Sequence, residues 1–112
     1  MVLREIATER VVVSANSTAV EELYHVPPGR RLHLRRIQVH FPVGTQSELK
    51  VRFLKGWIAI APTDGYLVGD DVVHVLDVDE YFGSQSAVRG EFVNTSTLNQ
   101  RECIVTLIGE LE

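Results

Sequence analysis

Residues 31–42 read RLHLRRIQVHFP, and this stretch decides the fold because it is the longest run of strand-forming residues in the chain. Apolar and polar residues alternate on both sides of the Arg35–Arg36 pair, but the phase of the alternation slips by one residue there. A uniform strand points successive side chains to opposite faces, so it cannot bury both apolar groups on one side. A β-bulge at Arg35–Arg36 adds one residue and restores a single apolar face.

This interpretation divides the central strand into two faces. The apolar face carries Leu32, Leu34, Ile37, Val39 and Phe41, and the opposite face carries His33, one of the two arginines, Gln38 and His40. A strand buried on both sides is the alternative, but two adjacent arginines in its middle argue against it.

The whole sequence predicts an all-β protein. About eight short strand-like stretches alternate with turn-forming segments, and sustained helical spacing is absent. The stiffest turn, Val26–Gly29 (VPPG), immediately precedes the central strand. This pattern is typical of an antiparallel β-sandwich of the jelly-roll type. The length of 112 residues predicts one domain over residues 1–112, with residues 1–10 as an edge strand or a loose arm.

Three local expectations accompany this fold. The alternation over residues 20–26 places Val20, Tyr24 and Val26 on one face and Leu23 on the other. Residues 57–61 form a short apolar strand, and Gly90 marks a bulge or a close approach in a later strand.

The charge and the distribution of apolar residues limit the classes of partner and the cellular locations to be expected. The formal net charge of −4 argues against a general binder of nucleic acid or of an anionic membrane. No apolar run reaches the length of a transmembrane helix, and the N-terminus MVLREIATER has charges where a signal peptide needs an apolar segment. The sequence therefore predicts no membrane segment and no secretory signal, and it leaves location in the cytoplasm or on a virion open.

The candidate chemical motifs are weak. His25 and His33 flank the proline turn, but two histidines without a nearby carboxylate or thiolate make a poor metal site. The acidic stretch 77–80 (DVDE) lacks the spacing of an EF-hand loop, and the serines show no Gly-x-Ser-x-Gly elbow. The single Cys103 lies in an apolar run and is expected in the core. We therefore predict no catalytic residue, metal or cofactor and a protein that is not an enzyme, with a metal-dependent cupin-like enzyme as a further alternative.

Two sets of residues are candidates for contacts. The basic pair Arg35 and Arg36 contrasts with a later acidic segment, and the basic strand of one copy facing the acidic segment of another would fix the register of a homo-oligomer. The acidic candidates are Asp77, Asp79 and Glu80. The alternative for this basic group, to which Arg30 and Arg31 also belong, is an anion site for phosphate, a sulfated glycan or nucleic acid.

The aromatic residues Trp57 and Tyr66 form the second set. They suggest a platform on which a sugar could stack. The alternative is that Trp57 lies in the core or in an interface, which is the commoner role of a tryptophan.

Residues 26–41 (VPPGRRLHLRRIQVHF), followed by short strands and by VLDVDEYF at 75–82, resemble small β-sandwich structural proteins of phages and archaeal viruses, such as capsid-decorating or tail modules. The resemblance implies a non-enzymatic protein that associates with itself, commonly as a trimer, and attaches to a larger assembly such as a virion. It carries no functional residue across. A carbohydrate-binding module that uses Trp57 and Tyr66 is the alternative function.

Overall fold

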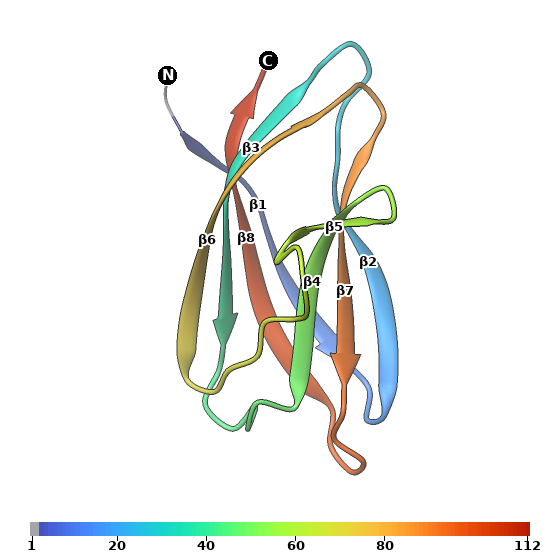
Figure 1. The fold of residues 1–112 in the computed structure, drawn as a ribbon, viewed down its shortest axis with the longest axis vertical. Coiled ribbons are helices and arrows are strands. Elements are labelled where there is room, and N and C mark those ends of the chain that lie inside the picture. The colour runs from blue at the N-terminus through green and yellow to red at the C-terminus, as the bar shows by residue number, and fades with distance from the viewer. Residues whose placement is uncertain (1–2) are drawn as a thin grey trace.

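The computed structural model describes residues 3–112, and these residues form two four-stranded antiparallel sheets packed face to face (Figure 1). The strands are β1 (Arg4–Val13), β2 (Ser17–His25), β3 (Leu32–Phe41), β4 (Leu49–Lys55), β5 (Ile58–Ala61), β6 (Val72–Phe82), β7 (Ala87–Asn94) and β8 (Arg101–Leu111). Sheet 1 has the order β1-β8-β3-β6 and sheet 2 the order β2-β7-β4-β5. This wrapping of the chain between two sheets is the jelly-roll arrangement, and the predicted fold class is confirmed. Among the described residues no helix is long and apolar enough to cross a membrane.

The bulge in β3 is present where the sequence predicts it. Leu34 pairs with Gly109 of β8 and Arg36 pairs with Ile108, so Arg35 is one extra residue relative to β8. The five predicted core side chains all have 0% of their surface exposed. The change of face at Arg35 therefore allows one strand to bury both of its apolar groups.

The core between the sheets contains four fully buried phenylalanines, namely Phe41, Phe53, Phe82 and Phe92. Cys103 is buried among the core residues, as predicted, and burial raises the pKa of its thiol to about 12. Because the thiolate is the reactive form, a thiol with this pKa is inert at neutral pH.

Two expectations about β2 and β3 are wrong. A second bulge lies between Glu22 and Tyr24, so Leu23 and Val26 are both buried whereas Val20 is 44% exposed. The face assignment over residues 20–26 fails because it assumed an unbroken strand. His33 does not lie on an open face, because it is only 4% exposed beneath a stacked aromatic ring.

The structure also tests the positions predicted for Trp57 and Gly90. The short strand begins at Ile58, and Trp57 lies in the preceding turn with 79% of its surface exposed, so a core position for this residue is wrong. Gly90 is a point of close approach, as predicted: a Cβ atom there would lie 2.6 Å from the Phe92 ring.

Candidate interaction surfaces

The predicted basic and acidic residues lie side by side in one chain. β3 and β6 are antiparallel neighbours, and their register places Arg36 opposite Asp77, with 3.1 Å between Nε and Oδ1. Arg35 is also engaged within the chain, since its charge contributes to lowering the pKa of Asp79. An ionic contact between copies through these residues stays a prediction, and it would have to compete with pairs that already exist.

The acidic segment is split between the two faces of β6. Asp77 and Asp79 project from the outer face, where Oδ1 of Asp79 lies 2.5 Å from Nε2 of His33. This hydrogen bond is the main reason that the pKa of Asp79 is lowered. Glu80 points to the other side of the strand and lies 3.5 Å from Nζ of Lys55 in sheet 2. Asp77, Asp79 and Glu80 are therefore not one continuous acidic surface.

A cluster that the sequence reasoning missed surrounds His33 at one end of sheet 1. The imidazole stacks on Tyr81 with 4.1 Å between ring centroids. The guanidinium of Arg31 lies over the Tyr81 ring in a cation–π contact, 4.5 Å from the ring centroid. Arg31 also binds Glu112, with 2.5 Å between Nη2 and Oε1. The members come from three strands or their ends, and only the strand register brings them together.

The predicted aromatic pair lies on sheet 2. Tyr66 packs on Arg52, with 4.9 Å from the guanidinium to the ring centroid, and its hydroxyl donates to Glu91 over 2.7 Å. Hydrogen bonds from Tyr66 and from Arg52 lower the pKa of Glu91. Trp57 lies against Arg89 instead. Each ring therefore has its own cation, and sugar binding through the two rings stays a prediction.

The Arg52–Glu91–Tyr66 cluster makes stability depend on pH. Because the pKa of Glu91 is lowered in the folded state, the cluster stabilises the protein above the ordinary value of 4.5, and this contribution is lost as the pH falls through the folded value. We expect Glu91→Gln to be less stable than the unaltered protein at neutral pH, and the difference to shrink in acid. Urea unfolding at a series of pH values measures both. A difference that is constant with pH would contradict the assignment.

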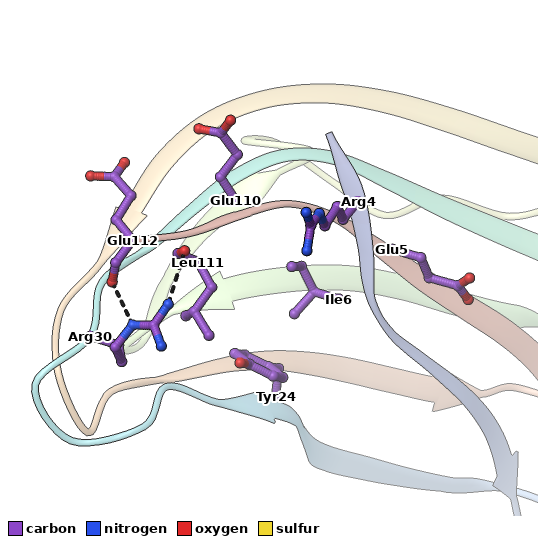
Figure 2. A pocket seen from close by; sticks show the side chains of 8 residues that line it. All are labelled: Arg4, Glu5, Ile6, Tyr24, Arg30, Glu110, Leu111 and Glu112. Atoms are coloured by element: carbon purple, nitrogen blue, oxygen red, sulfur yellow. Dashed lines mark hydrogen bonds between the residues drawn. The ribbon is translucent and has the colours of Figure 1, made fainter. Parts of the chain in front are cut away.

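An open groove of about 690 Å³ lies where β1 begins and β8 ends, with β2 along one side (Figure 2). Arg30 donates from Nε and Nη2 to the main-chain oxygens of Glu112 and Leu111, over 2.9 and 3.2 Å. Figure 2 shows the side chains of Glu110 and Glu112 pointing away from Leu111 and Tyr24. Eight residues line the groove, namely Arg4, Glu5, Ile6, Tyr24, Arg30, Glu110, Leu111 and Glu112, and the carboxylates of Glu110 and Glu112 point toward the outer side of sheet 1.

The outer face of sheet 1 has an uncharged centre. We call it the open face, and it consists of Val73 and Val75 of β6, Gln38 and His40 of β3, and Ile104, Thr106 and Ile108 of β8. Val73 and Val75 are each 53% exposed. The ion pairs Arg36–Asp77 and Arg10–Glu102 flank this centre. An uncharged centre with a charged rim is the usual composition of a protein–protein interface.

Comparison with known proteins supports the fold. No protein-family model and no curated protein matches the sequence. In structure the chain is similar to a protein of the cyanophage Pam1 capsid asymmetric unit, with a TM-score of 0.50 and 11% identity over 96% of this chain and 83% of that one. It is also similar to a protein of the acid-stable capsid of the Helicobacter pylori bacteriophage KHP30, with a TM-score of 0.50 and 14% identity over 97% of this chain and 94% of that one. The predicted resemblance to β-sandwich structural proteins of phages is confirmed for the fold.

Proposed function

We propose that this protein is a non-enzymatic structural module that associates with itself, with a trimer favoured, and attaches to a larger assembly such as a phage virion. The observation that carries the proposal is the open face of sheet 1. Two proteins of phage capsids share the fold, which gives a precedent for using it in a protein shell.

The open face offers apolar surface to a second copy. Burying one valine side chain completely stabilises a complex by about 1.5–3 kcal/mol, and Val73 and Val75 still expose about half of their surface. Association costs at least about 4 kcal/mol in lost freedom of motion, so these two residues alone do not sustain a stable contact. Ile104 and Ile108 of the neighbouring β8 have to contribute to the same interface.

The edge of sheet 1 adds to this surface. β6 is the last strand of the sheet and is 11 residues long, and a long edge strand presents main-chain groups that can pair with another chain. Its outward residues Val73 and Val75 are apolar at the end nearer the β3–β4 turn. The open face and the β6 edge together therefore form a surface suited to a contact between copies.

Replacing both Val73 and Val75 with lysine is expected to convert the oligomer into a monomer. Two charges at the centre of a closely packed interface lose their hydration without gaining partners, and the cost exceeds the gain from contact. Light scattering on the eluting peak of a size-exclusion column measures the mass, which we expect to fall from about three times 12.6 kDa to 12.6 kDa.

The matched control is Leu98→Lys, which adds a charge at an apolar residue that is 85% exposed in the β7–β8 loop, away from the open face. We expect it to leave the mass unchanged. A monomer for the unaltered protein at micromolar concentration would overturn self-association. An oligomer that survives both lysines would move the interface away from the open face.

A further inference from the structure

His33, Glu110 and Glu112 form a group of potential metal ligands on the outer side of sheet 1. A ring nitrogen of His33 and one carboxylate oxygen from each glutamate all lie within 4.8 Å of one another. The strand register explains the proximity, because His33 of β3 is paired with Glu110 of β8, and Glu112 lies two residues further along on the same side. The group thus joins one imidazole to two carboxylates.

The hydrogen bond to Asp79 determines which nitrogen of His33 is available. Nε2 lies 2.5 Å from Oδ1 of Asp79, and a carboxylate accepts hydrogen bonds, so Nε2 carries the proton. In the neutral imidazole the other nitrogen, Nδ1, then has a free lone pair. Nδ1 is the nitrogen left to bind an ion.

This Nδ1 atom is buried and has no hydrogen-bond partner among residues 3–112. The His33 side chain is only 5% exposed, so water does not readily replace the missing partner. A buried polar atom without a partner costs about 1–3 kcal/mol, and most such atoms in proteins are paired. A cation bound between this nitrogen and the two carboxylates would give the unpaired acceptor a partner.

We propose that His33, Glu110 and Glu112 bind a divalent transition-metal ion of the zinc type, with Nδ1 of His33 as the nitrogen ligand. Imidazole together with carboxylates suits zinc, whereas calcium and magnesium prefer oxygen ligands alone. Bonds of about 2.0–2.2 Å put the ligands of one ion within about 4.4 Å of one another. The separation of at most 4.8 Å between one ring nitrogen and the two carboxylate oxygens is close to this limit.

Asp79 is a positioning residue for this site. A metal-binding histidine usually donates its other N–H to a carboxylate, which fixes the orientation of the ring and makes the bound nitrogen more basic. Asp79 stands in that relation to His33, and the Tyr81 ring stacked on the imidazole holds its plane. The imidazole is therefore already held in position before an ion arrives.

Arg31 competes with the ion for Glu112. Its guanidinium binds the Glu112 carboxylate in the structure, and this pair has to open or shift when an ion is bound. We expect Arg31→Gln to bind zinc more tightly than the unaltered protein. A role of the cluster that is only structural predicts no such gain.

Isothermal titration of the metal-free protein with zinc chloride tests the proposal. We expect one zinc ion per chain, a loss of affinity of about tenfold or more in His33→Gln and in Glu110→Gln, and a loss of about 10–100-fold in Asp79→Asn. Calcium and magnesium at the same concentration are expected to give no binding. His40→Gln is the matched control, because it removes an imidazole from the same strand outside the group and should leave the affinity unchanged.

Three results would overturn the site: no zinc binding at millimolar zinc, unchanged affinity in both His33→Gln and Glu110→Gln, or a loss in His40→Gln as large as in His33→Gln. If His33→Gln does not fold, Glu110→Gln and Glu112→Gln decide the question, because both residues lie at the surface.

Discussion

Deleting Gln38 is expected to abolish cooperative folding, whereas deleting Arg35, three residues earlier in the same strand, is expected to leave a folded protein. Both changes shorten β3 by one residue. They differ in what they do to the alternation of its side chains, which the bulge at Arg35 controls.

Without Arg35 the strand reads Leu-His-Leu-Arg-Ile-Gln-Val-His-Phe, which alternates without interruption. All five buried apolar residues still face the core, and Leu34 and Arg36 become consecutive partners of Gly109 and Ile108 in β8. The pairing with β6 has to adjust around Val78 and Asp79, so we expect some loss of stability but a cooperative transition.

Without Gln38 no arrangement keeps the core intact. Either Val39 and Phe41 turn outward and His40 enters the core, or the bulge disappears and Arg36 takes the place of Ile37. Exposing Val39 and Phe41 costs about 3–6 kcal/mol, and burying a polar side chain without partners adds about 1–3 kcal/mol. The sum is comparable to the whole stability of a typical domain, about 5–15 kcal/mol.

Circular dichroism during thermal and urea unfolding distinguishes the two deletions. The substitution Arg35→Ala, which keeps the length of the strand, controls for loss of the arginine itself. Equal destabilisation by both deletions would mean that the extra residue is needed for the twist of the sheet and not only to correct its register. A cooperative transition in the Gln38 deletion would refute the register argument.

Two of the register shifts, the bulges in β3 and β2, show how far local patterns predict this fold. The bulge in β3 can be predicted from the sequence because enough apolar residues lie on both sides of Arg35–Arg36 to reveal the change of phase. The bulge after Glu22 is not, because β2 is an edge strand with a largely exposed outer face, and Val20 and Tyr24 give a regular alternation by themselves. Tertiary burial of Leu23 and Val26 decides the register there.

The candidate sites were less predictable than the fold, because they depend on which strands are neighbours. Charge complementarity between Arg36 and Asp77 is visible in the sequence, but the antiparallel pairing of β3 with β6 places it within one chain. The contact of His33 with Asp79 spans 46 positions and follows from the same pairing. Its proximity to Glu110 follows from the pairing of β3 with β8. Long-range packing determines the strand order, so no local sequence motif predicts these contacts.

Gly109→Ala is expected to destabilise the protein by about 3 kcal/mol, at the upper end of what overpacking costs. A Cβ atom at this position would lie 2.2 Å from the main-chain oxygen of His33 and 3.1 Å from Cα of Leu34. Both obstacles are main-chain atoms of the paired strand, so no side-chain rotation relieves the clash and β3 and β8 have to separate locally.

The control Gly83→Ala places the same methyl group where no atom lies within 4 Å, in a backbone conformation open to alanine. Alanine there reduces the freedom of the unfolded chain and should stabilise the protein by about 0.4–1 kcal/mol, so the two substitutions are expected to change stability in opposite directions. Urea unfolding measures the free energies of both variants. The expected difference between the two variants is well above the usual error of such measurements. If the two free energies of unfolding lay within about 1 kcal/mol of each other, β3 and β8 would approach less closely beside His33 than the structure shows. The register that brings His33 to Glu110 depends on this approach, so the same variant should also weaken zinc binding if the cluster holds an ion.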